Sequence, residues 1–384
     1  MEGIPVRHKI LWNIIRPLAA VFLFVKFGYR YKIAKELPKN YIVLANHTTD
    51  FDPIFTAVSF PKQMYFVGSE HISRWKIAYP LLKWAFRPIL RYKGTSAAST
   101  VMEMMRVLRK GGNVCMFPEG ARSWNGITAP ILPSTGKVVK SAKCGLVTYK
   151  IKGGYFVSPN WSEKGTRRGR ITGAVVNVYT SEQLAQMNVD QINEAIGRDL
   201  YEDAYERQLE APAAYRGKQL AYRIENMLSH CPNCLSMDTV HSEKDTVSCS
   251  HCGHQFRYTD HGFLEGIAQK TAKELFAWQK NQTLDDAKND VPYRAMSATL
   301  YTIADHQQTE LAHDAVVMDK ETLCCGDVAI RLRDITDMAM HGRHALVFSV
   351  GETYYELLMD GSDNALKFHL LYQAHMFGAI TKYN

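Results

Sequence analysis

The stretch Tyr41–Pro53, with the sequence YIVLANHTTDFDP, decides the fold of the first half of this 384-residue chain. Its first five residues are aliphatic or aromatic without interruption, which predicts a short buried strand. A polar turn begins at Asn46, and Pro53 can stand at the first position of a following helix. A strand, a turn and a helix in this order are typical of α/β folds, which place their chemistry where strands end.

His47 follows this strand almost directly, and Asp52 comes five residues later. A turn between them can bring the carboxylate onto the imidazole, which fixes the tautomer of the ring and makes it more basic. Such a pair can take a proton from a hydroxyl group, and we predict this role for His47 with Asp52 as its partner. A His and an Asp at this spacing also occur in surface turns without any function, so the interpretation needs a second motif.

The second motif is Phe117–Ser123, with the sequence FPEGARS, which follows another short apolar run at residues 114–117. It again places charged groups on a tight, Gly-containing turn at the end of a predicted strand. These groups are Glu119 and Arg122, on either side of Gly120 and Ala121.

Together, the N-H-x4-D and F-P-E-G-x-R-S motifs resemble those of the glycerolipid acyltransferase family, typified by the 1-acyl-sn-glycerol-3-phosphate acyltransferases. The resemblance covers about residues 10–225 and implies that His47 is the general base and that Asp52 orients it. It also implies that the residues around the two motifs bind the acceptor, and these are Asn46, Glu119, Gly120 and Arg122. The chain departs from the family at Ala121, where most members have Thr.

A basic strand end lies between the two motifs, in the segment ILRYKG at residues 89–94. Arg91 and Lys93 alternate with apolar or aromatic residues and so point to the same face of a strand. The resemblance implies that a basic residue at this place contacts the acceptor's phosphate. Lys93 matches the place best and Arg91 is the alternative, while a solvated pair of cations remains a further possibility.

The function implied by the resemblance is transfer of a fatty acyl chain from a thioester donor to the sn-2 hydroxyl of 1-acylglycerol 3-phosphate, giving phosphatidic acid for phospholipid synthesis. The donor is acyl-CoA or an acyl carrier protein, and the chemistry needs no catalytic cofactor. Two alternatives stay open. In the first, the acceptor is another lysophospholipid or polar lipid hydroxyl. In the second, the chain is a catalytically degenerate membrane scaffold.

Residues 9–29 are strongly apolar but are interrupted by Asn13, by Arg16-Pro17 and by Lys26. Because proline breaks or kinks a helix and the longest apolar run is too short to span a bilayer, we predict a hairpin of two short helices in the membrane interface. Packing of this hairpin on the domain's own core is the alternative. The net charge of +8 suits an anionic membrane surface.

The eight cysteines do not form a secreted disulfide framework, and no cleavable signal peptide is evident at the N-terminus. We therefore expect a monotopic protein on the cytoplasmic face of the cell membrane, of a bacterial type.

The middle of the chain contains two C-x2-C motifs separated by fourteen residues. Thiolates at this spacing converge on a tetrahedral Zn²⁺ and fill its coordination shell, so we predict a structural zinc ribbon. Its ligands are Cys231, Cys234, Cys249 and Cys252. The acidic residues Asp238, Glu243 and Asp245 lie between the motifs, so we do not expect nucleic acid as a partner.

The predicted organisation is therefore an α/β acyltransferase domain over residues 1–228, a zinc ribbon over 229–260, a helical linker over 261–293 and a last domain over 294–384. In the last domain, short alternating strands at residues 328–332, 346–350 and 354–359 precede a helix at about 364–377. This β-barrel-like pattern with a terminal helix resembles a pleckstrin-homology-like domain.

Overall fold

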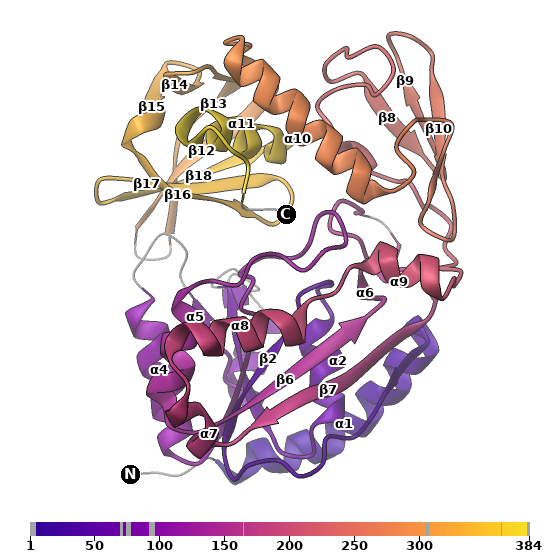
Figure 1. The fold of residues 1–384 in the computed structure, drawn as a ribbon. Coiled ribbons are helices and arrows are strands. Elements are labelled where there is room, and N and C mark those ends of the chain that lie inside the picture. Colours follow the sequence, from indigo (N-terminus) through magenta and orange to yellow (C-terminus); the bar gives the residue numbers. More distant parts are fainter. Residues whose placement is uncertain are drawn as a thin grey trace. The chain divides into compact units, whose positions relative to one another are not determined.

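The computed structural model describes residues 5–69, 72–73, 78–91, 97–163, 165–304, 307–361 and 363–381. The chain divides into two compact units (Figure 1). Unit 1 contains the residues up to Pro159 together with Thr166–Arg216. Unit 2 contains Gly217–Tyr383 and also the short segment Asn160–Gly165.

Unit 1 is built on a seven-stranded sheet (Figure 1). Its strands, in spatial order, are β1 (Tyr29–Tyr31), β7 (Ile171–Tyr179), β6 (Gly145–Lys152), β2 (Tyr41–Ala45), β5 (Asn113–Met116), β3 (Met64–Ser69) and β4 (Ile89–Arg91). Every neighbouring pair is parallel except β6 and β7, which are antiparallel. The predicted α/β architecture with mainly parallel pairing is therefore confirmed.

Helices cover both faces of this sheet, which explains why all five residues of β2 are buried and apolar. Ile42 and Leu44 pack with α4 (Ala98–Arg109), α5 (Ser134–Ala142) and α8 (Val189–Leu200) in one apolar core. Near the opposite face, Tyr41 lies against Phe60, which follows α2 (Asp52–Ser59). The remaining helices of unit 1 are α1 (Val6–Phe27), α3 (Ala78–Ala85), α6 (Gly154–Val157), α7 (Ser181–Gln186) and α9 (Ala204–Glu210).

The predicted hairpin at residues 9–29 is wrong, because α1 is one helix that continues through Pro17. Proline removes only one backbone hydrogen bond, and the carbonyl it frees belongs to the exposed residue Asn13. On the other side of the helix, Trp12, Leu23 and Phe27 are buried. Packing of these large side chains on unit 1 therefore outweighs the local cost of the proline.

The part of unit 2 that follows residue 217 begins with a 3-10 turn, η2 (Ile224–Met227), and a small antiparallel sheet. The order of its strands is β11 (Leu264–Glu265), β10 (Gln255–Tyr258), β9 (Thr246–Cys249) and β8 (Val240–Glu243). Strands β8 and β9 are antiparallel neighbours and form a hairpin.

Helix α10 (Ala272–Lys288) leads into a second, curled sheet of seven antiparallel strands. Their order is β15 (Val328–Arg331), β14 (Thr322–Cys325), β13 (Gln307–Met318), β12 (Tyr293–Ala304), β18 (Thr353–Met359), β17 (Ala345–Val350) and β16 (Ile335–His341). Helix α11 (Ala365–Phe377) follows the last strand, and the short turn η3 (Leu332–Asp334) connects β15 to β16. The predicted strands at 328–332, 346–350 and 354–359 and the terminal helix are present, whereas the assignment as a pleckstrin-homology-like domain stays a prediction.

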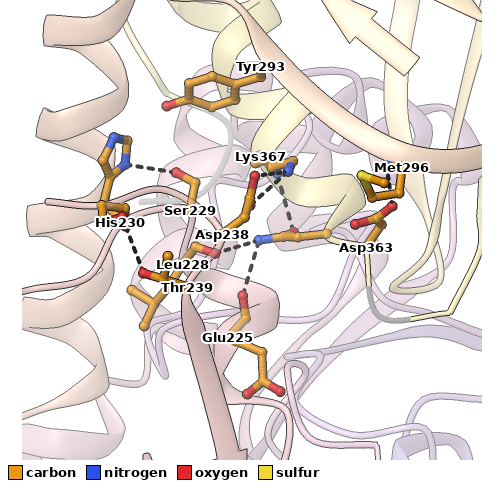
Figure 2. A network of polar contacts seen from close by, with 12 residues as sticks. Glu225, Leu228, Ser229, His230, Asp238, Thr239, Tyr293, Met296, Asp363 and Lys367 are labelled. Carbon is orange, nitrogen blue, oxygen red and sulfur yellow. Dashed lines mark hydrogen bonds and ion pairs between the residues drawn. The ribbon is translucent and has the colours of Figure 1, made fainter. Parts of the chain in front are cut away.

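A polar network inside unit 2 ties the N-terminus of α11 to η2 and to the loop before β8 (Figure 2). Strand β8 belongs to the small sheet of β8 to β11, which we call the ribbon sheet. Asn364 caps α11 through its side-chain oxygen, and its Nδ2 donates to the carbonyl oxygens of Glu225 and Leu228. The Lys367 ammonium is 1% exposed and donates to both oxygens of Asp238, each at 2.8 Å. The Asp238 side chain is 45% exposed, so water solvates its charge, whereas Lys367 has Asp238 as its charge partner among the described residues.

We predict that Asp238→Asn destabilises unit 2 much more than Lys367→Met does. The first change leaves a buried ammonium without its counter-charge, at a cost on the order of 3 kcal/mol, whereas the second exchanges side chains of similar volume for under about 1.5 kcal/mol. Asp238 has a positive φ of 54°, which Asn tolerates, so the substitution isolates the charge. Chemical denaturation measures both variants.

The matched control is Asp285→Asn, which breaks the exposed ion pair of Asp285 with Lys288 and should change the free energy of unfolding by less than about 0.5 kcal/mol. Equal losses of stability for Asp238→Asn and Lys367→Met would contradict the prediction.

Candidate active site

The two sequence motifs meet because β2 and β5 are parallel neighbours. Leu44 pairs with Met116 in the sheet register, so the turns that follow these residues lie at the same edge. Two backbone and side-chain contacts join the turns directly. The His47 N–H donates to Glu119 Oε1 at 2.6 Å, and the Ser123 N–H donates to the His47 carbonyl oxygen at 3.2 Å.

His47 and Asp52 form the predicted pair. The imidazole Nδ1 lies 2.9 Å from Asp52 Oδ2, and the His47 ring stacks on Phe117 with 4.6 Å between ring centroids. The Asp52 side chain is fully buried, while the side chain of His47 is 22% exposed. Since a carboxylate accepts, His47 donates from Nδ1, which makes Nε2 the acceptor nitrogen of the neutral ring.

The turn between these two residues holds the Asp52 carboxylate with four further donors. Oδ2 accepts the Thr48 and Thr49 backbone N–H groups at 2.5 and 2.8 Å. Oδ1 accepts the hydroxyl groups of the same two threonines at 3.2 and 2.8 Å. Donors on all sides compensate the burial of the charge and fix the oxygen that faces His47. Sequence reasoning missed both threonines, although two hydroxyl residues before an acidic helix start were visible.

Glu119 connects the second motif to its surroundings from inside the protein. Its second oxygen accepts the Ala129 N–H at 2.7 Å, so both oxygens are engaged with backbone donors. Burial raises the pKa of Glu119 to about 8, although the two N–H donors lower it, and the nearby Asp52 adds to the rise. Glu119 therefore carries less than a full negative charge at neutral pH.

Arg122 is nearly buried, and its guanidinium binds Asp50 and Ser158. Its Nη1 donates to Asp50 Oδ2 at 2.6 Å, and its Nη2 donates to the Ser158 carbonyl oxygen at 2.9 Å. The Asp50 side chain is 63% exposed. Asp50 lies in the first motif, three residues after His47, and was missed because only the His and the second Asp match the family pattern.

A third segment, residues 151–158, completes the site and has no motif of its own. The Asn46 amide donates to the Ile151 carbonyl at 2.9 Å and accepts the Ile151 N–H at 2.7 Å. A Cβ atom on Gly154 would lie 2.1 Å from the Thr48 hydroxyl oxygen, so this position requires glycine. The segment ends at Ser158, the acceptor for Arg122.

The remaining predicted residues fall into different places. Asn46 is fully buried and bound to backbone on both sides of its amide, which describes a structural tie rather than a surface for substrate. Gly120 has a φ of 72° and makes the turn that separates Glu119 from Arg122. Arg91 is the last residue of β4, at the carboxyl edge of the sheet, and is half-buried. Lys93 lies outside the described residues.

The four predicted metal ligands of unit 2 come together. The ligand atoms of Cys231, Cys234, Cys249 and Cys252 all lie within 4.8 Å of one another. The Sγ atoms of Cys231 and Cys252 are 3.9 Å apart and those of Cys234 and Cys249 are 3.8 Å apart. Four Zn–S bonds of about 2.3 Å in a tetrahedron place sulfurs about 3.8 Å apart, so the cluster fits and could hold such an ion.

Comparison with known proteins finds similarity to acyltransferases. The Acyltransferase family model matches residues 29–152, which include β1 to β6 of the sheet and both motifs. A curated relative is the 1-acyl-sn-glycerol-3-phosphate acyltransferase LPAT1, chloroplastic, from Arabidopsis thaliana, with 23% identity over 175 residues. The match covers 44% of this chain and 48% of LPAT1, so the chain spans about half the length of this relative.

Among solved structures, the 1-acyl-sn-glycerophosphate (LPA) acyltransferase PlsC from Thermotoga maritima is similar with a TM-score of 0.44 and 17% identity. The similarity covers 53% of this chain and 81% of that chain.

Proposed function

We propose, on the premise that residues 29–152 belong to the acyltransferase family, that this chain transfers a fatty acyl group from a thioester to the sn-2 hydroxyl of 1-acylglycerol 3-phosphate. The observation that supports this most directly is the His47–Asp52 pair, held at 2.9 Å beside Glu119 and Arg122. LPAT1 carries this acceptor class in its name. The donor is acyl-CoA or acyl carrier protein.

The reaction begins when Nε2 of His47 takes the proton of the acceptor hydroxyl. The oxygen attacks the thioester carbonyl, and collapse of the tetrahedral intermediate breaks the C–S bond and releases the thiol, which receives the proton from His47. Asp52 keeps Nδ1 as the donor and stabilises the imidazolium that forms. Thr48 and Thr49 stop the carboxylate from rotating away, because they bind both of its oxygens.

Arg122 is the proposed ligand of the acceptor's phosphate. A guanidinium can bind a phosphate with two parallel hydrogen bonds, and Arg122 is held in place by the carbonyl of Ser158. The exposed carboxylate of Asp50 can leave Arg122 at little cost when a dianionic phosphate competes for it. Gly120 shapes this turn, and Arg91 and Lys93 remain proposed second cations for the same phosphate.

Glu119 and Asn46 act in this proposal as positioning residues. Glu119 holds the backbone of His47, and Asn46 fixes the start of the same turn against Ile151. This assignment differs from the predicted direct contact with substrate, because both side chains are buried and bound to backbone groups.

A membrane surface is the proposed partner of α1. Exposed apolar side chains form a stripe on this helix, at Val6, Ile10, Ile14, Leu18, Val21 and Val25. By length and composition α1 is also able to cross a membrane. Its buried residues Trp12, Leu23 and Phe27 favour a monotopic helix, because one side of it packs on unit 1 along much of its length. The cysteine usage supports the cytoplasmic face.

The Cys cluster of unit 2 is the proposed site of one structural Zn²⁺. Four thiolates fill a tetrahedral shell, so no position remains for water or substrate. Backbone and side-chain donors surround the sulfurs, as a cluster of negative thiolates requires. The Asn233 N–H lies 3.4 Å from Cys231 Sγ, and the Thr239 hydroxyl lies 3.2 Å from Cys249 Sγ.

His47→Ala should abolish acyl transfer, and Asp52→Asn should reduce kcat by about 10³-fold or more, since Asn cannot support the imidazolium. Labelled acyl-CoA and a panel of lysophospholipids measure the transfer and identify the acceptor. His261→Ala is a matched control, because His261 also pairs with an Asp, Asp260 at 2.7 Å, but lies on the surface of unit 2. Substantial turnover by His47→Ala would refute the assignment, and no transfer by the intact protein would favour a scaffold.

Glutamate at Leu18 and Val21 should lower binding to anionic lipid vesicles by at least about tenfold, because burying each aliphatic side chain contributes about 1.5 kcal/mol or more. These positions are 66% and 63% exposed, so the fold should survive, whereas deletion of residues 9–29 would remove Trp12, Leu23 and Phe27 from the core. Vesicle sedimentation measures binding. Glutamate at Met296 and Leu311, exposed apolar residues of unit 2, is the control, and equal effects of both pairs would contradict the proposal.

Cys249→Ser should remove one zinc per chain and expose residues 229–258 to protease, because metal binding and folding of so small a segment are coupled. Metal analysis and limited proteolysis are made on one sample, with Cys324→Ser as the control because Cys324 lies in β14 outside the cluster. The kcat at saturating substrates should remain equal to that of the unsubstituted protein. A loss of kcat in proportion to the lost zinc, with unit 1 folded, would mean that the metal takes part in the chemistry.

A further inference from the structure

The segment Asn160–Gly165, which we call the strap, leaves unit 1 after Pro159 and returns to it at Thr166, but its structure belongs to unit 2. Six residues in the middle of the acyltransferase half of the sequence are thus packed by residues that come much later in the chain. Of the strap, residues 160–163 and 165 are described.

Trp161 is the most deeply held residue of the strap. Its side chain is fully buried, and its ring meets that of Tyr258 edge-on with 5.3 Å between centroids. Tyr258 is the last residue of β10, the strand that follows the final cysteine of the metal cluster. The backbone of Trp161 is held as well, since Asn226 Nδ2 donates to its carbonyl at 3.0 Å.

Glu163 fixes the other end of the strap through charge. Its Oε1 accepts from Arg223 Nε at 2.8 Å and from Asn226 Nδ2 at 3.0 Å, and His344 Nε2 lies 3.1 Å away. Burial alone would raise the pKa of Glu163, but the Asn226 and Arg223 hydrogen bonds outweigh it and lower the pKa, so the carboxylate stays charged.

Arg343, beside His344 in the turn between β16 and β17, donates to the Asn160 carbonyl. Residues of η2, of the ribbon sheet and of the curled sheet therefore all hold the strap.

The strap begins two residues after Ser158, whose carbonyl oxygen is part of the candidate active site. Ser158 gives its carbonyl oxygen to Arg122 at 2.9 Å, and Pro159 alone separates it from the strap. On the return side, the Arg167 N–H donates to the Val157 carbonyl at 2.8 Å, so both ends of the strap connect to the same short segment. Proline fixes φ at the one residue between Ser158 and Asn160, which reduces the number of free dihedral angles in this link.

We infer that Trp161 and Glu163 are positioning residues for binding of the acceptor's phosphate, acting through Ser158 on Arg122. This inference rests on the proposed role of Arg122. It assigns unit 2 a part in acceptor binding, because residues of unit 2 hold the strap, which follows Ser158 in the chain after Pro159 alone. The His47–Asp52 pair is held within unit 1.

The test is steady-state kinetics of the full chain with 1-acylglycerol 3-phosphate and acyl-CoA. Trp161→Ala should raise the KM for the phosphorylated acceptor about tenfold, as expected when a charged hydrogen bond is misplaced, and leave kcat and the KM for acyl-CoA within about twofold. Trp161→Phe should bring the acceptor KM back close to that of the unsubstituted protein, because an aromatic ring still meets Tyr258. Phe276→Ala removes a buried ring of α10 and controls for a general loss of packing in unit 2, so it should leave the acceptor KM unchanged.

A double-mutant cycle separates positioning from general damage. In an Arg122→Ala background, Trp161→Ala should add no further rise in KM, because the group it positions is gone. Glu163→Gln, which keeps the shape and loses the charge, should raise the acceptor KM in the same direction and replaces Trp161→Ala in the cycle if the latter does not fold. Hydrogen exchange of the peptide that contains Ser158 should increase in both strap variants.

An unchanged acceptor KM in folded Trp161→Ala and Glu163→Gln, or additive effects in the cycle, would overturn the inference while leaving the proposed function intact. No acyl transfer by the intact protein, with any acceptor of the panel, would instead overturn the proposed function and this inference with it.

Discussion

The active edge of unit 1 depends on the burial of two carboxyl groups, Asp52 and Glu119. Backbone N–H groups bind both of them, and hydroxyl groups also bind Asp52, so these donors compensate the loss of water. For Asp52 these donors come from the turn that it closes, which gives the turn one conformation. For Glu119 one donor is the His47 backbone itself. The two carboxyl groups therefore make the positions of both motifs interdependent.

The two buried carboxyl groups differ in the hydrogen-bond donors that surround them. Asp52 has several strong donors, two of them backbone N–H groups that belong to its own turn, which suits a charged carboxylate that faces an imidazole. Glu119 is buried with two donors, and its pKa rises to about 8.

The sequence was sufficient for the parts of the fold in which local pattern and tertiary environment agree. The five apolar residues of β2 predict a strand buried on both faces, and the parallel sheet provides that environment. The spacing of His47 and Asp52, and that of the four cysteines, also predicts that these side chains come together, as they do in the structure. Pro17 misled because its cost is local and small, whereas the burial of Trp12 and Phe27 depends on residues far along the chain. Strand β13 lacks an apolar face over most of its length, so its sequence contains no periodic signal.

Contacts made by backbone atoms were beyond the reach of sequence reasoning. Ser158 matters through its carbonyl, which every residue type has, and Ile151 matters through its N–H and carbonyl. Residue type gives no information on such roles. Trp161 did carry a signal, since a large aromatic residue in a polar loop indicates burial against something, but nothing near it in the sequence identifies Tyr258 as its partner. Burial of Trp161 is therefore explained by residues of unit 2 that come almost one hundred residues later in the chain.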